Sequence, residues 1–239
     1  MNLFYIPDLI KAKDVDNWII DLPTEEAKHA IKVLRLAVDD AVSVTDGKGQ
    51  MLFAHIIALN KKQCILKVDK VLKDYGKRNY RVHIAVAPTK NIKRFEWFLE
   101  KATEMGIDEI TPIISFHSER REIKAERENK VITAAMKQSL KAYHPVLNKA
   151  VSFKEFMQRQ TDEELFIAHL IDDKQLLLRD AVEAKKSILV LIGPEGDFSD
   201  EEIQMALSKN YRAVSLGNTR LRTETAALAA CFTINMINL

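Results

Sequence analysis

The architecture of the chain is clearest in the segment Ile188-Leu189-Val190-Leu191-Ile192-Gly193-Pro194-Glu195-Gly196-Asp197-Phe198-Ser199. Its apolar first half predicts a strand that is buried on both faces, and its glycines and proline predict a sharp turn. Ser199 and Glu202 have the spacing of a capping box, so a helix should follow over Asp200–Lys209. A buried strand that leads directly into a helix is typical of a parallel sheet covered by helices.

The same alternation continues over the rest of residues 74–239. Hydrophobic periodicity predicts further strands at Arg81–Ala87, Ile110–Ser115, Leu165–Ala168 and Ala213–Leu216, and further helices at Arg94–Met105, Ala125–Ser139 and Thr223–Leu239. We therefore expect an α/β domain over residues 74–239, with helices on both faces of a mostly parallel sheet.

Residues 1–73 have a different pattern. Short apolar runs at Leu3–Ile6, Ala41–Thr45, Met51–Leu59 and Gln63–Val71 predict strands, and Asp46-Gly47 between two of them is a hairpin signal. One helix is expected over Glu25–Val33. The pattern indicates a small β-barrel with one helix, and the polar stretch Lys73–Tyr80 is the expected domain boundary.

A second strand-to-helix turn lies at Leu216–Ala227, with the sequence LGNTRLRTETAA. Small polar residues at the start of the helix leave backbone amides free to donate hydrogen bonds. Arg222 and Glu224 lie beside that start. Because ligands of open α/β sheets bind at the carboxyl ends of strands, the two turns are the candidate site. A capped helix with a surface ion pair would have a similar sequence, so the residues alone leave both interpretations open.

Charge is distributed unevenly along the chain. The net charge is +2, but residues 76–150 hold 15 basic and 9 acidic side chains, a local balance of +6. A basic band of this kind suits a polyphosphate partner, although a solvated face would also produce it.

Several other classes of site find no support. The sequence has no GxGxxG, P-loop or GxSxG motif, and its six histidines show no metal-ligand spacing, so we expect no metal. His169 lies in an apolar run and is interpreted as a core histidine. No apolar run could span a membrane, and the first 16 residues do not resemble a signal peptide. Two cysteines without CxxC spacing favour a reducing cytoplasm.

The two turns together resemble those of the SPOUT RNA methyltransferases, and more closely the ribosomal RNA small subunit methyltransferase E family. The resemblance extends over most of the chain through His29–Arg35, Asp46-Gly47, Glu100–Gly106, Ile110-Thr111-Pro112, Ser118-Glu119-Arg120 and Gln138-Ser139. One departure lies in the first turn, where the family often has a glycine and this chain has Asp197.

The resemblance implies a knotted fold, a cofactor and a reaction. The C-terminal domain should form a trefoil knot, the N-terminal domain should be a PUA-like RNA-binding barrel, and the active form should be a homodimer. S-adenosylmethionine should bind at Ile192, Gly193, Pro194, Glu195, Gly196, Leu216, Gly217, Asn218, Leu221, Arg222, Thr225 and Ala226. The expected reaction methylates N3 of a uridine in 16S ribosomal RNA, with Arg222 stabilising the uracil anion and Glu224 orienting it.

An RNA surface is expected from two separated groups of residues. One is His29, Lys32 and Arg35, where Lys32 and Arg35 would share a face of one short helix. The other is Lys90, Lys93, Arg94, Arg120 and Arg121 in the basic stretch. Two separated contact regions suit a folded RNA or the assembled small subunit as substrate.

Two alternatives remain open at this point. One is a different SPOUT reaction, such as ribose 2′-O methylation. The other is an RNA-binding assembly factor that keeps the fold without catalysis.

Overall fold

The computed structural model describes residues 2–9, 17–169 and 176–239. The chain divides into two compact units, one formed by Met1–Lys77 with Met136–His144 and the other by Arg78–Ala135 with Pro145–Leu239. The segment Met136–His144 therefore returns to the first unit, whereas the sequence pattern predicted one domain over residues 74–239 that includes it. None of the described helices is long and apolar enough to cross a membrane.

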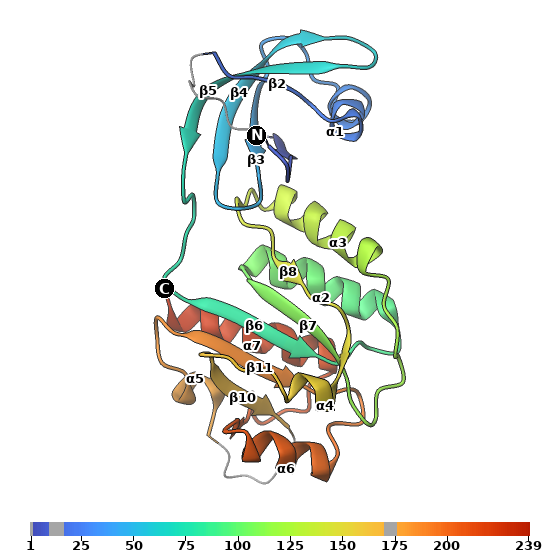
Figure 1. The fold of residues 1–239 in the computed structure, drawn as a ribbon, viewed down its shortest axis with the longest axis vertical. Coiled ribbons are helices and arrows are strands. Elements are labelled where there is room, and N and C mark those ends of the chain that lie inside the picture. Colours follow the sequence, from blue (N-terminus) through green and yellow to red (C-terminus); the bar gives the residue numbers. More distant parts are fainter. Residues whose placement is uncertain (1, 10–16, 170–175) are drawn as a thin grey trace. The chain divides into compact units, whose positions relative to one another are not determined.

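The second unit is built on a parallel sheet with the strand order β12-β10-β11-β6-β7-β8, and β9 also pairs with β7 (Figure 1). The strands are β6 (Arg81–Val86), β7 (Glu109–Ile114), β8 (Val146–Leu147), β9 (Val151–Ser152), β10 (Glu164–Ala168), β11 (Ser187–Ile192) and β12 (Arg212–Val214). The apolar β11 lies between β10 and β6, which explains why its residues Ile188–Ile192 are all buried.

Helices cover both faces of this sheet. They are α2 (Ile92–Met105), α3 (Ala125–Gln138), α4 (Phe153–Phe156), α5 (Leu178–Ala181), α6 (Asp200–Ser208) and α7 (Thr223–Ile237). Alternate residues of β11 face opposite sides: Val190 packs in one core with α2 and α7, and Leu189 packs in another with α4 and α6. The predicted strands and longer helices are all present, and the expectation of a covered, mostly parallel sheet is confirmed.

The first unit contains a five-stranded sheet in the order β1-β3-β4-β5-β2. Its strands are β1 (Asn2–Tyr5), β2 (Ile19–Asp21), β3 (Ala41–Thr45), β4 (Met51–Leu59) and β5 (Cys64–Leu72), beside the helix α1 (Thr24–Lys28) and the π-helix η1 (His29–Val33). β1 pairs with β3 in parallel, and the other pairs are antiparallel. The sequence did not predict β2, whose three residues are too few to show a period.

The returning segment is bonded to the tip of the β3–β4 hairpin. The Ala142 carbonyl accepts hydrogen bonds from Gly49 N at 2.9 Å and from Thr45 Oγ1 at 3.2 Å. Nearby, Lys137 Nζ lies 2.7 Å from a carboxylate oxygen of Glu26. These contacts explain why Met136–His144 belongs to the first unit although the rest of α3 belongs to the second.

Candidate functional site

The candidate site lies where β10, β11 and β12 end. Ala168 pairs in parallel register with Ile192 on one side and with Val214 on the other, so the three carboxyl ends lie side by side. A cavity of about 580 Å³ opens there, within the usual size range of small-molecule sites. It is lined by Ala168, His169, Ile192, Gly193, Pro194, Glu195, Gly196, Asp197, Ser215, Leu216, Gly217, Thr219, Arg220, Leu221, Arg222, Thr223 and Ala226.

The turn after β11 folds back closely over Gly193, where a side chain would be crowded. A Cβ on Gly193 would lie 3.1 Å from Asp197 Oδ1 and 3.2 Å from the Phe198 nitrogen. Asp197 has a φ of +62°, which favours glycine but is tolerated by aspartate, and its Oδ1 accepts a hydrogen bond from Phe198 N at 2.8 Å. The departure from the family pattern at this position is therefore compatible with the same backbone.

The second turn brings open backbone to the cavity. Gly217 has a φ of +130°, and an added Cβ would meet nothing within 4 Å, so the position faces open space. The Ser215 hydroxyl holds the bend by accepting from Gly217 N at 3.2 Å and donating to Gly217 O at 3.1 Å. The following helix α7 begins at Thr223, and its N-cap residue Arg222 makes no side-chain capping hydrogen bond. Its first amides therefore remain available to an anionic or polar ligand.

Ten of the twelve residues predicted for the cofactor line this cavity. They are Ile192, Gly193, Pro194, Glu195, Gly196, Leu216, Gly217, Leu221, Arg222 and Ala226, while Asn218 and Thr225 are not among the lining residues. Several other lining residues were not predicted from the sequence, most notably His169. This residue is 8% exposed, as expected of a core histidine, but it also lines the cavity. Burial lowers the pKa of His169, so its imidazole is uncharged at neutral pH.

The two residues predicted to be catalytic have different surroundings. Arg222 is exposed and lines the cavity. Glu224 is not among the lining residues and is 8% exposed. Its Oε1 lies 3.8 Å from Arg94 Nε in the first turn of α2, and its Oε2 is buried without a hydrogen-bond partner among the described residues. Glu224 therefore forms an ion pair with the neighbouring Arg94 and does not face the cavity directly.

Three loops at the carboxyl edge of the sheet are bonded to one another. Glu195 Oε1 accepts from Lys90 N at 3.0 Å, which joins the β11–α6 loop to the β6–α2 loop. Arg120 donates from Nε to Thr89 O at 3.1 Å and from an NH2 group to Lys90 O at 2.8 Å, which adds the β7–α3 loop. Arg120 thus holds the loops in place, while Lys90 carries its ammonium group at the surface beside Glu119, 2.7 Å away. Lys93 and Arg121 are exposed.

The prediction for the RNA-binding residues of the first unit is wrong in one respect. The π-helix η1 ends at Val33, and Arg35 follows it with a left-handed φ of +53°. Lys32 and Arg35 therefore do not share a face of one helix, because only Lys32 is helical. Both side chains are exposed, and His29 is half-buried in the first turn of η1.

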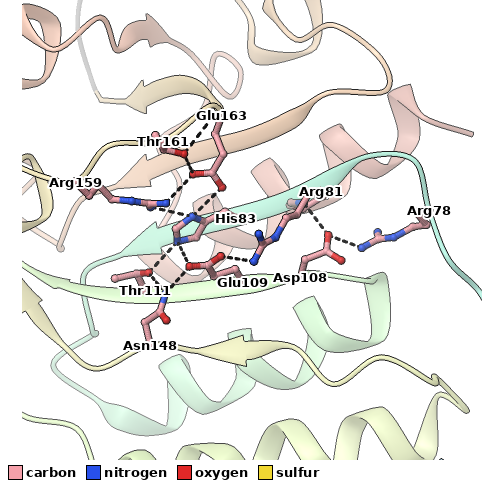
Figure 2. A network of polar contacts seen from close by, with 11 residues as sticks. Arg78, Arg81, His83, Asp108, Glu109, Thr111, Asn148, Arg159, Thr161 and Glu163 are labelled. Carbon is pink, nitrogen blue, oxygen red and sulfur yellow. Dashed lines mark hydrogen bonds and ion pairs between the residues drawn. The ribbon is translucent and has the colours of Figure 1, made fainter. Parts of the chain in front are cut away.

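A second polar cluster lies at the opposite, amino edge of the sheet (Figure 2). The fully buried His83 of β6 lies between Glu163, 3.1 Å from its Nδ1, and Thr111, 2.8 Å from its Nε2. His83, Glu109 and Glu163 each have an atom that could bind a metal ion, and these atoms lie within 4.8 Å of one another. Spacing in the sequence could not show this grouping. Figure 2 also shows guanidinium groups at both carboxylates: Arg81 contacts Glu109 at 2.5 Å and Arg159 contacts Glu163 at 2.9 Å. The two negative charges are therefore balanced by protein groups.

Comparisons with known proteins agree with this architecture. Residues 76–235 match the RNA methyltransferase domain family, and residues 22–69 match the RNA methyltransferase PUA domain family. The chain is 39% identical to a "probable rRNA-methyltransferase" of Porphyromonas gingivalis, with a TM-score of 0.88 and coverage of 100% of this chain and 98% of that one. It is 27% identical to a protein of Legionella pneumophila solved with bound SAM, with a TM-score of 0.86 and coverage of 99% and 97%. It is also 27% identical over 234 residues to ribosomal RNA small subunit methyltransferase E of Rickettsia conorii, covering 95% of this chain and 94% of that protein.

Proposed function

Because this chain belongs to the ribosomal RNA small subunit methyltransferase E family, whose members are S-adenosylmethionine-dependent RNA methyltransferases, we propose that it methylates N3 of a specific uridine in 16S ribosomal RNA. The substrate in this proposal is the assembled small subunit or a structured part of its RNA, and the setting is the cytoplasm. The cavity at the carboxyl ends of β10, β11 and β12 carries the proposal, because one concave site there unites ten of the residues expected to hold the cofactor.

The residues present fit S-adenosylmethionine. Apolar side chains suited to an adenine ring come from Ile192, Leu216, Leu221 and Ala226, and the open position at Gly217 leaves room for close approach to the backbone. Charged side chains suited to the amino-acid end of the cofactor come from Glu195, Arg220 and Arg222. When bound, this cofactor supplies a methyl group attached to a positively charged sulfur.

The proposed target atom sets two requirements. N3 lies on the Watson–Crick edge of uracil, so the base must be unpaired or turned out of its stack before it reacts. N3 also carries a proton that must leave as the new nitrogen–carbon bond forms, and negative charge then develops on the ring. A site that stabilises this charge makes the proton easier to remove, at about 1.4 kcal/mol for each unit of pKa.

Three side chains at the site suit these requirements. Arg222 is an exposed cation on the cavity wall and can stabilise the uracil anion. Glu224 acts through Arg94, since its carboxylate draws that guanidinium towards the start of α7. His169 presents an uncharged imidazole to the cavity, because burial lowers its pKa, and it can therefore accept a proton.

Both units carry residues for RNA in this proposal. In the second unit, these residues are Lys90, Lys93 and Arg94. The backbone nitrogen of Lys90 donates a hydrogen bond to Glu195 at the cavity, and Arg94 pairs with Glu224. In the first unit, Lys32 and Arg35 are exposed on the segment that ends η1. Contacts of lysine and arginine with phosphates would orient the RNA, while the cavity selects the base.

We also propose that the active form is a homodimer and that the second unit contains a trefoil knot. Support for the dimer comes from apolar side chains that remain exposed on two helices packed against each other: Phe232 and Met236 on α7 are 48% and 51% exposed, and Trp97 and Met105 on α2 are 42% and 37% exposed. Exposed apolar groups of this size commonly mark protein interfaces.

Nucleoside analysis tests the proposed reaction. The purified protein would be incubated with small subunits from a strain lacking this gene and with methyl-labelled S-adenosylmethionine, and the ribosomal RNA would then be digested to nucleosides. We expect label in 3-methyluridine, and much less of it with an Arg222→Ala variant. Label in a 2′-O-methyl nucleoside would identify a different SPOUT reaction. Cofactor binding without any labelled product would favour an assembly factor.

A further inference from the structure

We propose that Phe116 is a nucleobase-stacking platform, whose ring holds an unpaired base of the substrate RNA next to the base that is methylated. Phe116 lies in the β7–α3 loop and is 71% exposed. Among the large apolar side chains that the structure describes as exposed, Leu239 alone is more exposed. A single exposed apolar residue needs no explanation by itself. Its support and its position distinguish Phe116.

The turn that carries Phe116 is held from both sides. Ser115 N donates to Ser118 Oγ at 3.0 Å, and Ser118 N donates to Ser115 O at 3.1 Å, and both serines are buried. The Phe116 nitrogen donates to Glu202 Oε1 at 2.9 Å. The other oxygen of Glu202 accepts from Ser199 N as part of the capping box of α6. The ring is therefore presented on an ordered backbone, so little backbone freedom is lost when a ligand stacks on it.

The same turn packs against the cavity wall through the next residue. His117 Nδ1 lies 3.0 Å from Asp197 O, and a Cβ on Gly196 would lie 3.1 Å from His117 Cβ. Gly196 and Asp197 both line the cavity. The rings of Phe116 and His117 are 5.0 Å apart and meet edge to face. Phe116 therefore directly precedes a residue that contacts the cavity-lining turn at Gly196 and Asp197. A base next to the methylated one would pass at this place.

Basic side chains outnumber acidic ones in the loop that carries Phe116. Arg120, Arg121 and Lys124 lie there with Glu119 and Glu122, and Glu119 is paired with Lys90. Arg121 is exposed, and Arg120 joins this loop to the main chain at Lys90. An aromatic ring beside basic side chains is the usual arrangement in proteins that bind unpaired RNA, since bases stack on the ring and phosphates contact the cations.

Because this inference rests on the proposed function, its test uses RNA binding as well as methyl transfer. The variants are Phe116→Ala, Phe116→Leu, Phe116→Tyr and Phe116→Trp, and Tyr75→Ala is the matched control because Tyr75 is an exposed aromatic residue of the first unit. Each is measured for S-adenosylmethionine affinity, RNA affinity, oligomeric state, and kcat and KM with small subunits.

We expect Phe116→Ala to weaken RNA binding and raise KM by about 5- to 150-fold, the usual effect of losing one stacked base. The tyrosine and tryptophan variants should stay close to the parent, cofactor affinity and oligomeric state should be unchanged in all, and tryptophan fluorescence of Phe116→Trp should be quenched by RNA. Equal RNA affinity of Phe116→Ala and the parent overturns the inference. So does a leucine variant as good as the tryptophan one, or a change of oligomeric state with Phe116→Ala, because either result indicates an ordinary apolar contact. If the parent forms no 3-methyluridine, the proposed function fails, while the RNA-affinity series still decides the role of Phe116.

Discussion

Arg94 and Glu224 join the starts of two helices that pack together, α2 and α7, with Arg94 Nε 3.8 Å from Glu224 Oε1. The Glu224 side chain is almost fully buried and its second carboxylate oxygen has no hydrogen-bond partner among the described residues, whereas the Arg94 side chain is 40% exposed. A buried carboxylate needs a compensating charge or donor. The positive end of the α7 dipole and the Arg94 guanidinium both contribute to this compensation.

This arrangement predicts an asymmetry between the two partners. Arg94→Ala should lower the free energy of unfolding by about 1–3 kcal/mol, because it leaves Glu224 buried without its cation. Glu224→Gln should cost less, since it removes the buried charge. The double variant should be close to Glu224→Gln alone, and urea unfolding of all four proteins measures the cycle. Additive effects would show that the two residues do not interact.

The parts of the site that the sequence predicted are those coded locally. The turn from Gly193 to Gly196 follows a recognisable strand, and Gly217 follows another, so both could be placed at the carboxyl edge of a sheet. The participation of Ala168 and His169 depends instead on the register that pairs Ala168 with Ile192 and Val214. Strand order is a non-local property, so periodicity in one sequence cannot supply it.

Two further features were invisible for similar reasons. His83, Glu109 and Glu163 come from segments far apart in the chain and meet only through the order of the parallel strands. The end of the helical segment that begins near Glu25 could not be predicted either. Its last turn is a π-helix that ends at Val33, and Arg35 then has a left-handed conformation. Neither the cluster nor the helix end has a periodicity of its own that a single sequence would reveal.

The cluster in Figure 2 predicts a loss of stability in acid. Burial by itself would raise the pKa of Glu163, but the hydrogen bond and charge of His83, with help from Thr161 and Arg159, lower it to about 2 from the usual 4.5. A carboxylate with a lowered pKa stabilises the folded state above pH 4.5, and this contribution is lost as the pH falls from 4.5 towards 2. The loss should be on the order of 3 kcal/mol.

Denaturant unfolding between pH 6 and pH 3 (roughly the range that linkage makes informative) measures this effect. Glu163→Gln should be less stable than the parent at neutral pH and should lose less stability on acidification. Glu183→Gln is the control, because this substitution removes the same charge from the same unit and the Glu183 side chain is 69% exposed. Parallel pH profiles for the parent and Glu163→Gln would contradict the assignment.

A substitution at Gly217, which lines the cavity, tests whether the cofactor binds there. A valine there would point its side chain into open space at the cavity and would strain a backbone with φ of +130°. We expect Gly217→Val to abolish S-adenosylmethionine binding by calorimetry while the cooperative unfolding transition persists. Gly76→Val is the matched control, since Gly76 has a φ of +72° and open surroundings but lies in the first unit. Cofactor affinity in Gly217→Val equal to that of the parent would show that the site is misplaced.

The proposed homodimer predicts a response to charge on α7. Phe232→Glu combined with Met236→Glu should shift the protein from dimer to monomer in sedimentation at micromolar concentration, because a dimer interface would bury these side chains and would not accept two carboxylates. Ile57→Glu, at an exposed position on β4 of the first unit, should leave the dimer intact. A parent protein that is monomeric at this concentration would refute the dimer.

Charge reversal at two places separates the contributions of the two units to RNA binding. Arg35→Glu changes the first unit and Lys93→Glu the second, and both side chains are exposed. For every phosphate that the protein no longer neutralises, the slope of log affinity against log salt should fall by about 0.7–0.9, so the double variant should show a shallower slope than either single one. S-adenosylmethionine affinity should stay unchanged, because neither residue lines the cavity. Lys154→Glu makes the same charge change on α4, outside the basic stretch, and should have little effect. If the double variant binds and methylates ribosomal RNA like the parent at physiological salt, the basic residues form only a solvated face, and the RNA surface must lie elsewhere.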